Sequence, residues 1–237
     1  MKLSAPIYRL KRQAKLLSRA EGIPLHQALD RIAFKEGFTR WSLLAADISV
    51  TATARTLLGH FTPGDLVLLG ARPGHGKTQL SLELIVEAMK SGHQGVFFTL
   101  EYSVTDILDL FKSIGEDPAV FRHAFEFDAS DEISATYIMA NLATVPIGTV
   151  VIIDYLQLLD QKRQNPELMT QVRTLKTFAI ERGLIIVFIS QIDRSFDSSA
   201  RACPGTRDVR LPNPLDLKLF NKTCFLHNGE LDVSTPG

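Results

Sequence analysis

Residues 71–79 are of types suited to holding a triphosphate and its metal ion. In chain order they are Ala71, Arg72, Pro73, Gly74, His75, Gly76, Lys77, Thr78 and Gln79. The two glycines allow positive φ angles, so successive backbone N–H groups can curl around a phosphate. Lys77 is placed to reach the β- and γ-phosphate oxygens, and the Thr78 hydroxyl to bind Mg²⁺. We predict that these residues bind ATP with Mg²⁺ and that Lys77 is also catalytic; the alternative is a chance Gly-Lys-Thr sequence in a surface turn.

Two carboxylates follow apolar runs that have the composition of buried strands. Glu101 comes directly after residues 94–100, and Asp154 ends the run 149–154. Because the carboxyl ends of parallel strands meet at one edge of a sheet, both acids are expected beside the nucleotide. We predict that Glu101 polarises the attacking water and that Asp154 organises the Mg²⁺ ligands. The alternatives are a first-turn acid of a helix reaching Ile114, for Glu101, and an ordinary strand-ending residue, for Asp154.

A third apolar run, 184–189, ends in Ser190 and Gln191. A glutamine at the same edge of the sheet can hydrogen-bond the γ-phosphate and sense its loss. We predict that catalytic role for Gln191; the alternative is a loop glutamine without a function. The next segment, 192–213, is rich in Arg, Ser, Asp and Pro and is expected to be a mobile loop. A β-hairpin is predicted over 223–233.

The elements that must position these residues alternate between strand and helix patterns. A buried strand is predicted over 65–70, and an amphipathic helix from Lys77 to Met89 follows the glycine-containing turn. Further helices are predicted over 132–143 and 167–182. Such alternation gives an α/β fold with a mainly parallel sheet that is covered by helices on both faces. We expect one domain of this kind over residues 48–237.

Residues 1–47 have the pattern of a separate, small helical segment. Apolar residues recur at helical spacing over 7–18, and a second helix is predicted after Pro24. The first helix has a basic face made of Arg9, Lys11, Arg12, Lys15 and Arg19. This face is expected either to contact phosphates or simply to be solvated, and the helices to bind a protein partner. A short helix near Trp41 and a polar, Thr-rich connection over 48–61 are predicted next.

Composition restricts the class of protein only broadly. The 237 residues include 26 Lys or Arg and 26 Asp or Glu, so the net charge neither favours nor excludes nucleic acid. Two cysteines without a Cys-x-x-Cys spacing argue against a disulfide framework or a zinc site. No apolar run approaches the length of a membrane span or signal peptide. We expect a cytoplasmic protein without a membrane partner.

Four motifs together resemble those of DnaB-type replicative helicases, a branch of the RecA-like P-loop ATPases. The motifs are residues 71–78, 97–103, 151–159 with its Asp-Tyr-Leu-Gln run, and 190–194. The resemblance implies a RecA-like core, hydrolysis of Mg-ATP, and assembly of a ring or filament on single-stranded DNA. We therefore expect a DnaB-like ATPase coupled to nucleic acid, as in a DNA helicase.

Two departures from the family pattern leave other functions open. Residues 1–47 are shorter than the family's helical N-terminal domain, and the Lys-Gln-Arg segment that follows the sensing strand is not found. The arginines available to replace it are Arg194, Arg201, Arg207 and Arg210. Without an arginine finger, which can contribute about 10³-fold or more in rate, hydrolysis is expected to be slow. The alternatives are an ATP-dependent regulatory switch with a helical adaptor, and a kinase or other phosphotransferase.

Overall fold

The computed structural model divides the chain into two compact units, Met1–Ala52 and Thr53–Gly237. The described residues are 7–160, 165–198, 201, 203–211, 213–227 and 230–235. Within these ranges, no helix has both the length and the apolar character needed to cross a membrane.

The N-terminal unit is built from helices that share a small apolar core. Its helices are α1 (Ile7–Glu21), α2 (Leu25–Lys35) and the first part of α3 (Trp41–Leu58). Leu10 and Ala14 of α1 are buried against Ala28 and Ile32 of α2, which explains the helical spacing of these residues. The backbone N–H of Trp41 donates to the Asp30 carboxylate at 2.8 Å and so fixes the start of α3.

The segment predicted as a polar connection, 48–61, is instead mostly helical. It belongs to α3, which continues without interruption from Trp41 to Leu58. The prediction was wrong because Thr and Ser lower helix propensity only slightly, whereas Gly and Pro lower it strongly. Residues 41–58 contain neither of these breakers, and the first one is Gly59, directly after the helix ends.

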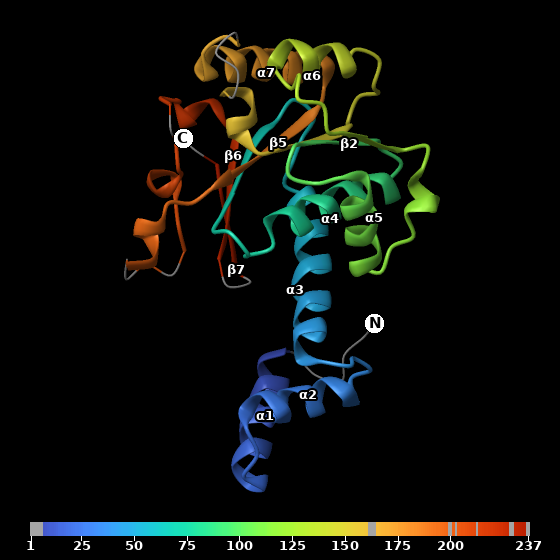
Figure 1. Ribbon diagram of the computed structural model, residues 1–237, viewed down its shortest axis with the longest axis vertical. Coiled ribbons are helices and arrows are strands. Elements are labelled where there is room, and N and C mark those ends of the chain that lie inside the picture. The colour runs from blue at the N-terminus through green and yellow to red at the C-terminus, as the bar shows by residue number, and fades with distance from the viewer. Residues whose placement is uncertain are drawn as a thin grey trace. The chain divides into compact units, whose positions relative to one another are not determined.

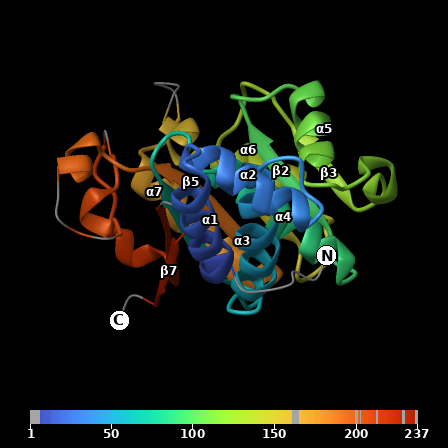
Figure 2. The ribbon, with the colours of Figure 1, turned by 90° about the horizontal axis from the view of Figure 1, so that it is seen from below.

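The second unit is organised around a seven-stranded sheet. Its strands are β1 (Leu66–Ala71), β2 (Gly95–Thr99), β3 (Phe125–Asp128), β4 (Val150–Asp154), β5 (Ile185–Gln191), β6 (Lys222–His227) and β7 (Glu230–Ser234). They are ordered β3-β2-β4-β5-β1-β6-β7, and only the β6–β7 pair is antiparallel. Seen from below, β3 and β7 lie at opposite ends of this sheet (Figure 2). The predicted hairpin is present, although its turn, Asn228-Gly229, lies outside the described residues.

Helices cover both faces of the sheet, as the alternating sequence pattern predicted. The α-helices of this unit are α4 (Lys77–Lys90), α5 (Val104–Ser113), α6 (Ala135–Asn141) and α7 (Leu168–Arg182). Short 3₁₀ helices span Pro118–Phe121, Leu156–Asp160, Arg194–Ser198, Thr206–Asp208 and Leu217–Leu219. Helices α6 and α7 cover one face, and α4 and α5 the other (Figure 1). The central strands β1, β2, β4 and β5 are almost fully buried, so the α/β class is confirmed. Helix α6 is shorter than predicted and begins after the Ser134 cap.

Gly95 allows α4 to pack closely against β2. A Cβ atom at this position would lie 2.3 Å from Ile85 Cγ2, and real Cβ atoms do not approach other atoms so closely. We expect Gly95→Ala to lower the free energy of unfolding by about 2 kcal/mol, because α4 or the Ile85 side chain must move to make room for the new methyl group. Urea unfolding measures this change.

Gly205→Ala is the matched control for this substitution. A Cβ atom at Gly205 would meet no atom within 4 Å, and its φ of −141° suits any residue. Its unfolding midpoint should match that of the wild type. Equal midpoints for the two variants would contradict the close contact between α4 and β2.

Candidate active site

The predicted phosphate-binding segment forms the turn between β1 and α4. Strand β1 ends at Ala71, α4 begins at Lys77, and Gly76 occupies the N-cap position with φ 82°. Gly74 also has a left-handed backbone, with φ 80°, and nothing lies within 4 Å of a Cβ atom built on either glycine. The turn therefore has the conformation that only glycine adopts without strain, and open space beside it.

Thr78 and Asp154 meet at the carboxyl end of the sheet. The Thr78 hydroxyl donates to Asp154 Oδ2 at 3.3 Å, which joins the first turn of α4 to the end of β4. Asp154 is completely buried, and its second oxygen, Oδ1, has no hydrogen-bond partner among the described residues. A buried carboxylate oxygen without a partner is costly, so this atom is suited to an additional ligand.

Two charged side chains, Glu101 and Lys77, affect the pKa of the Asp154 carboxyl group. Burial and then the negative charge of Glu101 raise its pKa to about 7, while the positive charge of Lys77 and the hydrogen bond from Thr78 act in the opposite direction. The structure thus brings Lys77, Thr78, Glu101 and Asp154 within electrostatic range of one another. A cation placed among these oxygens would stabilise the charged form of Asp154.

Glu101 follows β2 and stays outside the next helix. Its side chain is exposed, and its backbone N–H donates to the Thr99 hydroxyl at 3.0 Å. Helix α5 begins at Val104, and Ser103 and Asp106 form a reciprocal capping box at its start. The alternative that Glu101 is a first-turn acid is therefore wrong, because other residues cap this helix.

Gln191, the sensing residue predicted from the sequence, lies beside the turn between β1 and α4. Gln191 is the last residue of β5, which is longer than predicted, and it pairs in register with Ala71 of β1. Arg72 Nη1 also donates to the Ile192 carbonyl at 3.0 Å, so the turn is tied to the segment after Gln191. The neighbouring Ser190 hydroxyl is buried and has no partner among the described residues.

Gln79 and His75, which were predicted to bind the nucleotide, make their contacts away from Thr78 and Asp154. The Gln79 amide donates to Glu83 Oε1 at 3.0 Å along the surface of α4. The His75 ring stacks on His227, the last residue of β6, with ring centroids 5.0 Å apart. His227 in turn meets the Phe196 ring edge-on at 5.1 Å.

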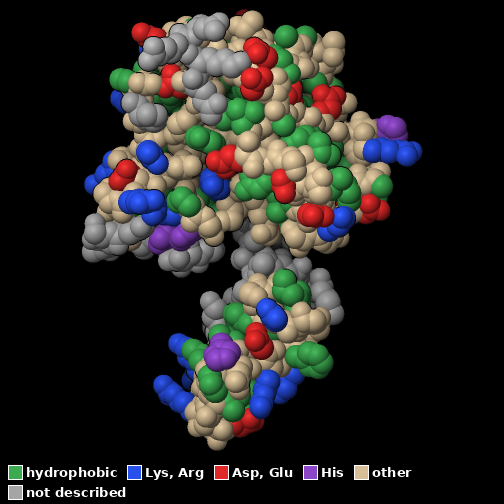
Figure 3. Space-filling model, viewed as in Figure 1, with side chains coloured by type: hydrophobic (Ala, Val, Ile, Leu, Met, Phe, Trp, Pro, Cys, Tyr) green, Lys and Arg blue, Asp and Glu red, His purple; other side chains and the backbone are tan. Residues whose placement is uncertain are grey.

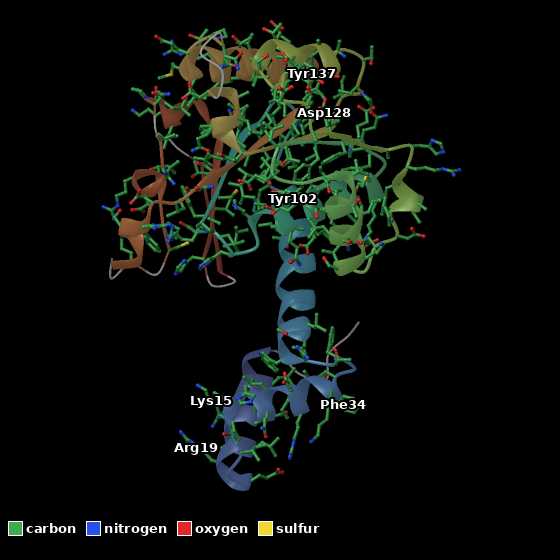
Figure 4. The ribbon with its side chains drawn as sticks, viewed as in Figure 1. Lys15, Arg19, Phe34, Tyr102, Asp128 and Tyr137 are labelled. Atoms are coloured by element: carbon green, nitrogen blue, oxygen red, sulfur yellow. The ribbon has the colours of Figure 1, made fainter. Side chains whose placement is uncertain are left out.

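Sequence reasoning missed two side chains that contact the site. The Tyr102 hydroxyl donates to Thr78 Oγ1 at 3.4 Å, and Figure 4 shows Tyr102 beside α4. The sequence offered one signal for Tyr102, which is its position directly after Glu101. His227 has no such signal, because only the pairing of β6 with β1 brings it to the turn.

Arg201 makes several contacts within the segment predicted to be a mobile loop. Its guanidinium donates two hydrogen bonds to Asp208, at 2.7 and 2.6 Å, and lies 5.2 Å from the centre of the Phe196 ring. This pairing lowers the pKa of the Asp208 carboxyl group. Ile192 also forms a strand-like bridge with Val209. Arg201 is therefore paired within this chain, whereas Arg194, Arg207 and Arg210 are exposed.

A cavity of about 320 Å³ lies at the other end of the strands. Val150 and Ile185, which begin β4 and β5, line it, together with Leu58 and Phe61. Asp154 is at the opposite end of β4, so this cavity is separate from the site described above.

The seven-stranded sheet and the helices that cover it form a RecA-like α/β fold that solved structures share. The structure is similar to a solved ATPase domain, with a TM-score of 0.56 and 20% identity over 71% of each chain. It is also similar to a solved KaiC-like protein from Pyrococcus horikoshii, with a TM-score of 0.53 and 19% identity, a match covering 74% of this chain and 78% of that chain. At this level of identity the likeness concerns the fold.

Sequence comparison links the chain to DnaB-type helicases. Residues 124–213 match the DnaB-like helicase C terminal domain. The chain is 25% identical over 196 residues to the replicative DNA helicase DnaB of Helicobacter pylori, a match covering 68% of this chain and 40% of that protein. It is 28% identical over 206 residues to a probable plasmid replicative DNA helicase of Chlamydia trachomatis, covering 72% and 46% respectively. The resemblance seen in the motifs is thus confirmed, and the chain spans less than half the length of these relatives.

Proposed function

We propose that this chain is a DnaB-like, RecA-fold ATPase that binds and hydrolyses Mg-ATP in a process coupled to nucleic acid. The observation that carries the proposal is the meeting of Thr78 and Asp154, with Lys77 and Glu101 close enough to affect the Asp154 charge. Similarity to replicative DNA helicases over about two thirds of the chain supports it. The ATPase part would be residues 48–237, and residues 1–47 a separate module.

The residues present fit a triphosphate and Mg²⁺. The open turn at Gly74 and Gly76 offers backbone N–H groups to phosphate oxygens, and the start of α4 adds the positive end of its dipole. The unpartnered Asp154 Oδ1 and the Thr78 hydroxyl are oxygen ligands of the kind that Mg²⁺ prefers. When bound, the ion would neutralise the phosphate charge.

Each protein side chain has a separate task in this proposal. Lys77 binds the β- and γ-phosphate oxygens, and Thr78 and Asp154 hold the metal ion. Glu101, exposed at the end of β2, orients water and accepts its proton. Gln191, which pairs in register with Ala71 beside the turn, hydrogen-bonds the terminal phosphate and senses its loss.

The proposed partners follow from the relatives. Because the matched proteins are named replicative DNA helicases, we infer single-stranded DNA as the nucleic acid and assembly into a ring or filament. A regulatory switch that holds ATP and hydrolyses it slowly is the second candidate. The observation that favours it is the pairing of Arg201 with Asp208, which occupies one of the four candidate arginine fingers.

ATP turnover with and without single-stranded DNA tests the proposal. We expect Mg²⁺-dependent hydrolysis that DNA stimulates, and a larger mass by light scattering when a non-hydrolysable ATP analogue is present. ATP binding at constant mass, without turnover or DNA stimulation, would favour the switch. Absence of ATP binding would contradict both candidates.

A further inference from the structure

Helix α1 has two opposite faces with different chemistry. Leu10 and Ala14 are buried against α2, whereas Arg12, Lys15 and Arg19 are exposed on the other side. Their spacing of three and four residues places the three cations within about 60° of arc and along about 10 Å of the helix. We call this set the basic stripe. Figure 4 shows Lys15 and Arg19 projecting together from α1.

The sequence predicted a larger basic face on this helix. It also included Arg9 and Lys11, whose side chains lie outside the described part of the chain. The basic stripe therefore consists of Arg12, Lys15 and Arg19 alone.

The basic stripe has no neutralising partner among the described residues. None of its three side chains forms a hydrogen bond or an ion pair there. Two acids of the same unit are engaged elsewhere, because Glu21 pairs with Arg31 and Asp30 accepts from the Trp41 backbone. The positive charge of the stripe is therefore available to a ligand.

The charge of the chain is strongly segregated between the two units. Residues 1–52 contain nine Lys or Arg and four Asp or Glu, a net charge of +5, so residues 53–237 carry −5. The neutral total hides this separation. Lys and Arg side chains outnumber acidic ones on the N-terminal unit in Figure 3. Concentrated positive charge on a small separate unit is the pattern of a surface that binds a polyanion.

We propose that the basic stripe binds the phosphate backbone of duplex nucleic acid without sequence preference. A duplex presents one negative charge per roughly 1.7 Å of its axis, a higher density than a single strand, so three aligned cations release more counterions from it. Sequence-tolerant binding of single strands usually needs aromatic side chains for base stacking. Among the aromatic side chains of this unit that the structure describes, the exposed one, Phe34, projects from α2 on the other side from Lys15 and Arg19 (Figure 4).

This surface lies outside the ATPase unit, and the inference does not depend on ATP hydrolysis. The test therefore uses the nucleotide-free full chain and fluorescence anisotropy with a labelled duplex of about 20 base pairs at several salt concentrations. The triple variant Arg12→Gln, Lys15→Gln, Arg19→Gln is expected to bind at least about tenfold more weakly at low salt. The slope of log affinity against log salt should fall by about 0.9 for each cation removed.

Two controls separate the stripe from general charge effects and from misfolding. Lys35→Gln removes an exposed lysine of the same unit from α2, and its binding should stay closer to wild type than that of Lys15→Gln. The charge-preserving variant Arg12→Lys, Lys15→Arg, Arg19→Lys should bind as the wild type does.

Four results would overturn the inference. Three of them are equal losses for Lys15→Gln and Lys35→Gln, an unchanged salt slope in the triple variant, and a larger loss of single-strand binding than of duplex binding in the triple variant. Absence of duplex binding by the wild-type chain at low salt would also overturn it, and would assign the stripe to a protein partner or to solvent. The Lys77→Ala variant should bind duplex normally, so failure of the ATPase proposal remains distinguishable.

Discussion

Replacement of Lys77 by alanine is expected to weaken ATP binding by roughly 100-fold and to remove measurable turnover. Lys77 is the first residue of α4, directly after the turn that contains Gly74 and Gly76. Its positive charge acts to lower the pKa of Asp154. No other lysine lies in the segment 71–79 to replace it. Calorimetric titration with a non-hydrolysable ATP analogue measures the affinity, and phosphate release measures the turnover.

The control for this prediction is Lys112→Ala. Lys112 is exposed on α5 and pairs with Asp109 on its own helix, so the substitution removes the same charge away from the turn. Its ATP affinity and turnover should equal those of the wild type. If Lys77→Ala also bound and hydrolysed ATP normally while remaining folded, the assignment of the phosphate-binding turn would be wrong.

The sequence predicted where the residues at the centre of the candidate site lie, because these positions are encoded locally. The turn between β1 and α4 depends on glycines and on the strand and helix on either side of it, all within a few residues. Glu101, Asp154 and Gln191 each end an apolar run, and parallel strands bring such ends to one edge of the sheet. The register pairs Thr99 with Asp154 and Ala71 with Gln191, as that rule requires.

Contacts that depend on the order of the strands were beyond the sequence. His227 contacts His75 only because β6 lies next to β1 in the sheet. No local sequence pattern predicts that these two strands are neighbours. The Arg201–Asp208 pair also depends on how the segment after β5 folds back, which Ile192 and Val209 hold in place. Composition alone could not predict these contacts, because polar residues and prolines are common in many kinds of irregular segment.

The boundary between the two compact units lies inside helix α3, where the sequence gives no signal for it. The sequence suggested a boundary at residue 47, where the polar connection was expected to begin, whereas contacts divide the chain after Ala52. Helix α3 runs through both positions, so no loop composition marks the change. A search of the sequence for glycine, proline or polar linkers cannot locate a boundary that lies inside a continuous helix.

Substitution of Glu101 by glutamine is expected to lower turnover by roughly 10² to 10⁴-fold while ATP binding is retained, where the range is that of one general base. Glutamine keeps the shape of the side chain but cannot accept a proton from water. The change also removes a negative charge that raises the pKa of Asp154, so affinity for the negatively charged nucleotide should stay equal or increase. Single-turnover kinetics at saturating Mg-ATP, together with a separate binding titration, measure the two quantities independently.

Glu126→Gln provides the matched comparison, because Glu126 is an exposed acid on the neighbouring strand β3 and loses the same charge. Its single-turnover rate should equal that of the wild type. A Glu101→Gln variant that hydrolysed ATP at the wild-type rate would show that another group positions the water, and a variant that lost binding instead would make Glu101 a nucleotide ligand. Slow chemistry with intact binding agrees with a carboxylate that lies outside α5, has no capping role, and stands at the sheet edge where Thr78 contacts Asp154.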